Sequence, residues 1–175
     1  GDDARAADIL GTIKSEATLD RVRRAEDTGR VLTGSRAVTH PKYADAVVRT
    51  PAVVAVDGDD DDIYMHEMFG PVVYVVATDS TSESLELARR SARDKGALTW
   101  LVYSVDESVM DAAEAAAVDA GVSLAFNLTG GLFVNQSAAF SDFHVTGANP
   151  AGNASLTDPA FVANRFRVVG IRKPA

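Results

Sequence analysis

The chain has 175 residues, of which 46% are hydrophobic and 24% are charged, and its formal net charge is −8. This length and composition suit one hydrophobic core, so we expect a single domain over residues 1–175. The acidic balance argues against a nucleic-acid or anionic-membrane partner, since both are bound through clustered Lys and Arg. The sequence shows neither a membrane-spanning apolar run nor a secretory leader, and we therefore expect a cytoplasmic protein.

The first half of the chain predicts a helical segment followed by short strands. Apolar residues recur at helical spacing over Arg5–Thr28, and Gly29 follows as a stop signal. The runs Val47–Val48 and Ala52–Val56 are rich in β-branched residues and are predicted as strands. The acidic run at residues 57–62 is predicted as a solvated turn.

The second half alternates regularly between strands and helices. We predict a buried strand at Val72–Val76, a helix capped by Ser80 and ended by Gly96, a strand at Ala97–Tyr103, a helix capped by Asp106 and ended by Gly121, and a strand at Val122–Phe126. This β-α-β-α-β order predicts an α/β fold, with helices in three-layer α/β/α fashion on both faces of a parallel sheet. Ligands of such sheets bind beyond the carboxyl ends of the strands.

Metal sites and hydrolytic triads find little support in the sequence. Cysteine is absent, which removes thiolate ligands and any cysteine nucleophile from these residues. The acidic run resembles a calcium loop only in part, because Asp62 stands where Gly is needed and Met68 where a Glu is needed. The histidines have no metal-ligand spacing, and Ser141–His144 is too crowded in sequence to indicate a serine triad. We therefore predict no metal site and no serine triad within the chain.

The segment just before Val72 carries a candidate binding pair, Glu67 and Phe69. Gly70-Pro71 imposes a turn that would aim the preceding side chains into a cleft, where an aromatic ring can pack on a ligand ring and a carboxylate can accept hydrogen bonds from sugar hydroxyls. The local pattern fits equally well with Phe69 in the core and Glu67 on the surface.

These residues carry a resemblance to a known family. His66–Val72 resembles the Glu-x-Phe-Gly-Pro motif of the aldehyde dehydrogenases, and Gly29–Gly34 and Thr50–Val54 look like the strands that precede it in that family. Phe140–Gly147 stands where the family usually has Phe-Gly-Gly-x-Lys-x-Ser-Gly. The departure from that pattern, over Val134–His144, looks most like the branch associated with phenylacetic acid degradation.

The resemblance implies a parent enzyme that oxidises an aldehyde to an acid with NAD or NADP. By resemblance, Glu67 holds the nicotinamide ribose hydroxyls, Phe69 lies beside the nicotinamide ring and Phe140 lines the aldehyde pocket. The family's cysteine nucleophile, glutamate base and oxyanion-hole asparagine map to sequence before Gly1. The resemblance therefore implies a C-terminal fragment of the catalytic domain that is inactive alone.

The closing run Arg165–Ile171 alternates like a strand with one solvated face. The resemblance implies that it adds to a neighbouring subunit's sheet and makes the protein a homo-oligomer. Pairing within the same chain is the alternative.

Two other classes of function stay open. A stand-alone interaction module could keep this fold and use the terminal strand for assembly, and a genuine start codon near Gly1 would favour it. A small-molecule binding domain could use the strand-end cleft without chemistry, and saturable binding without turnover would favour that reading.

Overall fold

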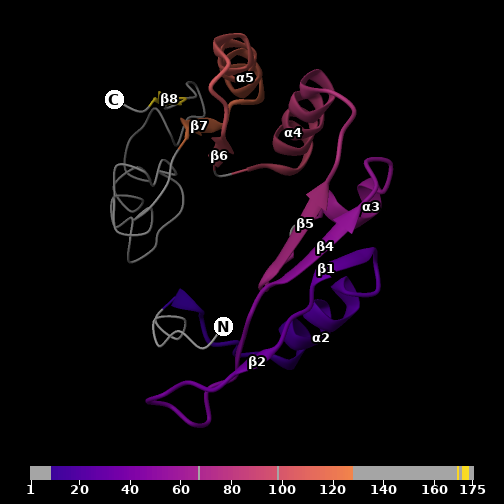
Figure 1. Cartoon of the computed structure of the whole chain (residues 1–175), viewed down its shortest axis with the longest axis vertical. Helices are drawn as coiled ribbons and strands as arrows, with labels where there is room; N and C mark the ends of the chain where they lie inside the picture. Colours follow the sequence, from indigo (N-terminus) through magenta and orange to yellow (C-terminus); the bar gives the residue numbers. More distant parts are fainter. Residues whose placement is uncertain (1–8, 67, 98, 128–168, 170, 174–175) are drawn as a thin grey trace, which may run out of the picture. The chain divides into compact units, whose positions relative to one another are not determined.

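The computed structural model describes residues 9–66, 68–97, 99–127, 169 and 171–173. The chain divides into two compact units, Gly1–Thr78 and Asp79–Ala175, and each is described by itself (Figure 1). That residues 1–175 act as a single domain stays a prediction. Among the described residues, no helix has the length and apolar character needed to cross a lipid bilayer.

The first unit begins with helix α2 (Glu16–Ala25). The Ser15 hydroxyl caps it by accepting a hydrogen bond from the Thr18 backbone N–H at 3.2 Å. One face of α2 buries Val22 and Ala25, which are each 1% exposed. The helix predicted within Arg5–Thr28 is confirmed over these residues, and residues 1–8 lie outside the described part of the chain.

A three-stranded sheet follows in the order β1 (Arg30–Thr33), β4 (Ala52–Val56) and β5 (Val72–Val76). Strand β1 runs antiparallel to β4, and β4 runs parallel to β5. A separate ribbon pairs β2 (Ala37–Val38) with β3 (Val48–Arg49). The strands predicted around Val48, at Ala52–Val56 and at Val72–Val76 are therefore confirmed.

The two faces of β5 differ in their exposure. Val54 on β4 is fully buried and pairs with Tyr74, which lines a cavity together with α2 residues. Alternation along the strand turns Val73 and Val75 to the opposite face, where they are 47% and 41% exposed. The expectation of a strand buried on both faces is therefore wrong for Val73 and Val75 in the described structure.

The acidic run is partly helical. A turn closes at its start, where the Asp60 backbone N–H donates to the Asp57 carbonyl at 3.1 Å. The one-turn helix α3 (Asp61–Tyr64) then follows. The Tyr64 hydroxyl lies 2.7 Å from Asp61 Oδ1 and 2.6 Å from the Gly58 carbonyl. The predicted solvated turn thus covers only the first part of the run.

The second unit follows the predicted alternation of helices and strands. Its elements are α4 (Thr81–Lys95), β6 (Thr99–Val102), α5 (Glu107–Ala120), β7 (Ser123–Phe126) and β8 (Ile171–Arg172). The predicted caps are confirmed: the Ser80 hydroxyl accepts from the Glu83 N–H at 3.1 Å, and Asp106 Oδ1 accepts from the Ser108 N–H at 2.8 Å. The two stop glycines also end their helices with positive φ, 86° at Gly96 and 68° at Gly121.

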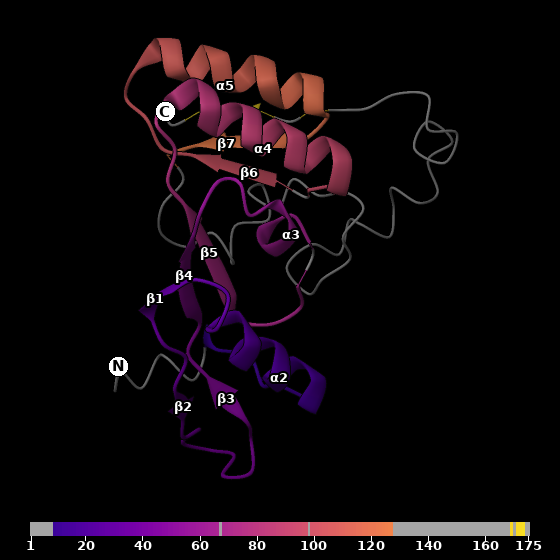
Figure 2. The same ribbon diagram turned by 90° about the vertical axis from the view of Figure 1, so that its right-hand side faces the viewer.

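Helices α4 and α5 lie side by side over β6 and β7 and share one core (Figure 2). Small side chains on the helices, Ala92, Ala113, Ala117 and Ala120, let the helices approach Leu124 and Phe126 closely. Strands β6 and β7 are parallel, as predicted, so the α/β class with parallel strands is confirmed. Strand β5 pairs with β4, and the described strands form two three-stranded sheets and one ribbon.

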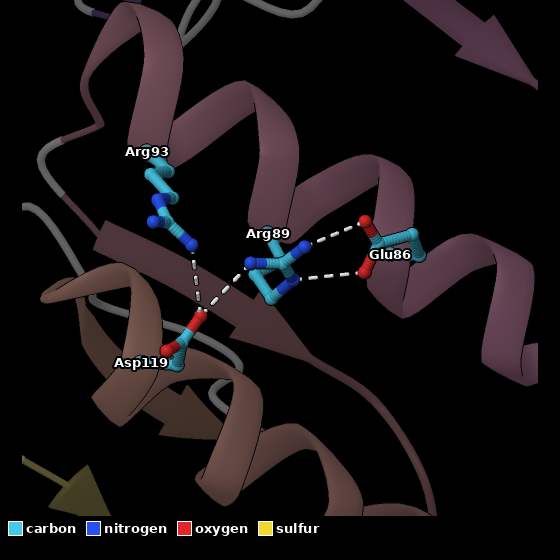
Figure 3. A network of polar contacts seen from close by, with 4 residues as sticks. All are labelled: Glu86, Arg89, Arg93 and Asp119. Atoms are coloured by element: carbon cyan, nitrogen blue, oxygen red, sulfur yellow. Dashed lines mark hydrogen bonds and ion pairs between the residues drawn. The ribbon is translucent and has the colours of Figure 1, made fainter.

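A polar network joins the outer surfaces of α4 and α5 (Figure 3). Arg89 Nη1 lies 2.9 Å from Asp119 Oδ2, and Arg89 Nη2 lies 2.7 Å from Glu86 Oε1. These hydrogen bonds raise the pKa of Arg89 and lower that of Glu86. Such pairs at a wet surface contribute little stability each, so the alanine-rich core is the main contact between the helices.

The described end of the terminal strand, β8, pairs within its own chain. Ile171 lies opposite Leu124 in a parallel pair with β7. Lys173, just after β8, forms an ion pair with Glu114 of α5 at 3.0 Å. Residues 165–168 lie outside the described part of the chain, and an oligomerisation role for Arg165–Ile171 stays a prediction.

Candidate functional site

The candidate site lies where the chain enters β5, in the segment that contains Phe69. The Phe69 side chain is 68% exposed, so it does not belong to the hydrophobic core of the described structure. Nearby Met65, by contrast, is only 6% exposed and anchors the start of the segment. The exposed ring of Phe69 therefore offers a flat apolar surface to a ligand, while the buried Met65 side chain fixes the start of the segment.

Two contacts fix the backbone around Phe69. Arg21 of α2 donates from Nε to the Phe69 carbonyl oxygen at 3.1 Å. Two residues later, the Pro71 carbonyl accepts from the Ala52 N–H at 2.9 Å, which joins the segment to the start of β4. The chain is thereby held on one side by a helix and on the other by a strand.

Gly70 makes this close approach possible. Its φ of +153° lies in a region that L side chains rarely adopt. A Cβ at this position would also lie 3.3 Å from Thr18 Cγ2 on α2. The glycine of the Gly70-Pro71 pair is therefore required by its backbone angle and by its contact with the helix.

Two of the three predicted binding residues cannot be placed. Glu67 and Phe140 lie outside the described residues, so the structure does not show whether they approach Phe69. Sequence reasoning also missed Arg21, which is separated from Phe69 by 48 residues. Nothing in the local pattern distinguishes Arg21 from the other arginines of α2.

The carboxyl ends of β6 and β7 form a second polar feature. The Asn127 amide, immediately after β7, bonds both the N–H and the carbonyl of Ser104, which follows β6, at 3.0 Å and 2.7 Å. These two hydrogen bonds join the segments that follow β6 and β7 within the second unit. The loop that follows, residues 128–131, lies outside the described part.

No metal site is seen among the described residues. They contain no cluster of three or more His, Asp or Glu side chains that could hold an ion. His40 instead accepts backbone hydrogen bonds at Nδ1 from Lys42 and Tyr43, at 3.1 Å and 3.2 Å. His144 lies outside the described residues.

Comparison with known proteins decides the family. A family model described as "Aldehyde dehydrogenase family" matches residues 1–137, well over half of the chain. The chain belongs to the aldehyde dehydrogenase family. This match includes the segment from His66 to Val72, whose motif carries the resemblance in the sequence.

Two individual aldehyde dehydrogenases show how much of the family this chain represents. It is 26% identical over 111 residues to "Aldehyde dehydrogenase family 3 comG" of Dictyostelium discoideum, an alignment of 63% of this chain and 22% of that protein. It is 56% identical to a solved NAD-dependent aldehyde dehydrogenase from Burkholderia multivorans, with a TM-score of 0.73 over 91% of this chain and 28% of that one. The chain therefore spans only about a quarter of the length of the aldehyde dehydrogenases that it matches.

The solved aldehyde dehydrogenase also supports the fold. A TM-score of 0.73 at 56% identity confirms that this mixed α/β architecture with parallel strands is an aldehyde dehydrogenase architecture. The sequence-based prediction of the family and of its fold class is therefore confirmed.

Proposed function

We propose that this chain is the part of an aldehyde dehydrogenase catalytic domain that lies downstream of the catalytic cysteine. In this proposal the parent enzyme oxidises an aldehyde to an acid with NAD, and the chain contributes walls of the cofactor and substrate sites without catalysing the reaction alone. The match to about a quarter of a 56% identical NAD-dependent enzyme supports this assignment.

The single observation that carries the proposal is the exposed Phe69 ring on a fixed backbone. Its carbonyl is held by Arg21 at 3.1 Å, while its side chain is 68% exposed. A flat aromatic surface held in this way fits one face of a nicotinamide ring. The nicotinamide supplies the hydride acceptor, and Phe69 in this proposal only orients it.

Glu67 and Phe140 complete the proposed site. A carboxylate two residues before Phe69 can accept hydrogen bonds from the ribose hydroxyls, and Phe140 would contribute an apolar wall to the aldehyde pocket. In the parent enzyme, Glu67→Gln should weaken cofactor binding and lower turnover. An unchanged KM for NAD and an unchanged kcat in this variant would contradict the proposed contact between Glu67 and the ribose.

The uncovered face of β5 supports membership in a larger fold. Val73 and Val75 are 47% and 41% exposed on a strand that pairs in parallel with β4. Parallel sheets in proteins are covered on both faces. In this proposal, the apolar face packs against another segment of the parent enzyme.

Absence of a nucleophile supports the proposed inactivity. In the proposed reaction, a cysteine thiolate of the parent enzyme would attack the aldehyde carbon before a hydride passes to NAD, and the chain contains no cysteine. The test is aldehyde-dependent formation of reduced cofactor by this chain beside a version extended upstream through the cysteine and the cofactor domain. We expect activity in the extended protein alone; activity in the short chain would overturn the proposed inactivity.

The same assay addresses substrate and cofactor. The segment Val134–His144 resembles the phenylacetic acid degradation branch, so we propose an aldehyde from aromatic acid breakdown as substrate. The extended enzyme should then give a higher kcat/KM with arylacetaldehydes than with short aliphatic aldehydes. NAD should also be preferred over NADP, as the name of the solved relative suggests; a preference for NADP would contradict that part.

A second candidate function, a non-catalytic assembly module, is favoured by the exposed apolar face of β5 and by the position of β8. In the described sheet, β8 is the last strand in the order β6-β7-β8. An edge strand can add to a sheet of another subunit, so we also propose a homo-oligomer. Sedimentation of the chain with and without residues 165–175 tests the oligomer, and a monomer in both cases would contradict it. Absence of aldehyde oxidation by the extended protein would favour the non-catalytic module.

A further inference from the structure

The guanidinium of Arg21 is held at two points. Its Nε donates to the Phe69 carbonyl at 3.1 Å, and its Nη2 donates to Thr18 Oγ1 at 3.0 Å. The guanidinium is one rigid plane, so two bonds from different nitrogens fix its orientation as well as its position. The bond to Thr18 is partly buried, whereas the bond to the Phe69 carbonyl is exposed to solvent.

Support for Arg21 continues to the start of α2. The Thr18 hydroxyl that receives the Arg21 bond lies 3.0 Å from the Ser15 hydroxyl. Ser15 is in turn the N-cap of the helix. Because Val22 beside Arg21 is 1% exposed, the helix cannot rotate without exposing its core contact. Arg21 therefore reaches Phe69 from a rigid element with a fixed register.

The Arg21 hydrogen bond reaches Phe69 itself, whereas the hydrogen bond between Ala52 and Pro71 lies two residues further along the chain. The Phe69 ring is 68% exposed, and the next residue, Gly70, has no side chain to restrict the backbone. A peptide group before glycine can rotate at low cost unless its carbonyl is bonded. The Arg21 hydrogen bond restrains this rotation, and with it the direction in which the Phe69 ring projects.

We propose that Arg21 is a positioning residue of the enzyme, which acts through Phe69 and does not itself contact cofactor or aldehyde. The inference rests on the proposed contact between Phe69 and the nicotinamide ring. Holding the ring in place before the cofactor arrives removes an ordering cost from binding. Loss of Arg21 should therefore weaken the apparent affinity for the cofactor more than it slows the chemical step.

The first test uses the chain itself and needs no activity. Amide hydrogen exchange is measured over residues 68–70 and at Val72, since Pro71 has no amide hydrogen, in the unaltered chain and in Arg21→Gln, Arg21→Lys and Arg23→Gln. Arg23 is the matched control, because it lies on the same helix and pairs with Glu16 and Asp20, at 3.2 Å and 2.9 Å. We expect the Val72 amide, whose N–H donates to the Gly70 carbonyl at 2.9 Å, to exchange about fivefold faster in Arg21→Gln, because loss of one ordinary hydrogen bond makes local opening of the segment easier by that factor. Lysine should rescue this effect in part. Unchanged exchange would overturn the proposal.

The second test uses the enzyme extended upstream. Arg21→Gln should raise KM for NAD about fivefold with less than a twofold change in kcat, and Arg23→Gln should change neither. A Phe69→Ala variant separates the two proposals. If Phe69→Ala raises KM for NAD and Arg21→Gln does not, the positioning role is wrong and the Phe69 contact stands. If Phe69→Ala has no effect, the proposed cofactor contact fails, and the positioning role with it.

Discussion

The Asn127 side chain bonds the Ser104 backbone at both of its polar groups. Asn127 Oδ1 accepts from the Ser104 N–H at 3.0 Å, and Asn127 Nδ2 donates to the Ser104 carbonyl at 2.7 Å. Asn127 also has a φ of +50°, in the left-handed region that asparagine tolerates better than most residues. One residue thus ends β7 and ties its carboxyl end to that of β6.

Asn127→Ala should destabilise the second unit by about 2 kcal/mol, because it removes both hydrogen bonds and leaves an L side chain at positive φ. Asn127→Gly removes the same bonds but adopts this φ freely, so its cost should be lower by about 1 kcal/mol. Urea unfolding of the chain measures both. Equal stability of the unaltered protein and Asn127→Ala would show that the paired bonds contribute nothing net.

The two glycines that flank β1 should differ sharply in their tolerance of alanine. A Cβ at Gly29 would collide with the Ala55 backbone carbonyl and lie 2.9 Å from Val56 Cγ1. At Gly34 the nearest such atom is Glu26 Oε1, at 3.8 Å and on a flexible side chain. We expect Gly29→Ala to cost about 2 kcal/mol or more and Gly34→Ala less than about 0.5 kcal/mol in thermal unfolding. A larger loss at Gly34 would contradict the packing of β1 on β4.

Leucine-to-alanine substitutions should separate the two faces of the second unit. Leu124 is fully buried in the alanine-rich core, whereas Leu101 is 41% exposed. Leu124→Ala should cost about 3 kcal/mol through lost transfer energy and a new cavity, and Leu101→Ala less than about half of that. Denaturant unfolding of the two variants checks the order. Similar losses would show that Leu101 packs more extensively than its exposure indicates.

The N-cap of α5 should make the helix sensitive to acid. The Ser108 hydroxyl, together with the backbone N–H groups of Ser108 and Val109, holds the pKa of the Asp106 carboxyl below its usual value. A carboxyl whose pKa is lowered by folding stabilises the folded state above its unfolded pKa, and this contribution is lost as the pH falls through the folded pKa.

Asp106→Asn keeps a capping oxygen but has no charge to titrate. The difference in melting temperature between the unaltered chain and Asp106→Asn should therefore favour the unaltered chain at neutral pH and shrink below the pKa of Asp106. A difference that stays constant with pH would show that the charge of Asp106 is not involved.

Much of the local structure could be predicted from the sequence, because its determinants are local. Ser80 with Gly96 and Asp106 with Gly121 bound α4 and α5, since a capping side chain bonds backbone groups only two or three residues away. The run Val72–Val76 became a strand for a similar reason, as β-branched residues favour extended backbone. The short helix α3 was missed because a single turn has no periodicity to detect.

The sequence by itself determined the alternation of helices and strands in the second half of the chain, the caps of those helices and, through the motif around Phe69, the family. Only the tertiary structure decided which strands pair, that Val73 and Val75 remain exposed, and that Arg21 holds the Phe69 carbonyl. Caps and strand propensities act over a few neighbouring residues, whereas burial and the Arg21 contact depend on packing between segments separated by up to 48 positions. A local sequence pattern does not predict which distant segment a residue will contact, so these contacts are seen only in the three-dimensional structure.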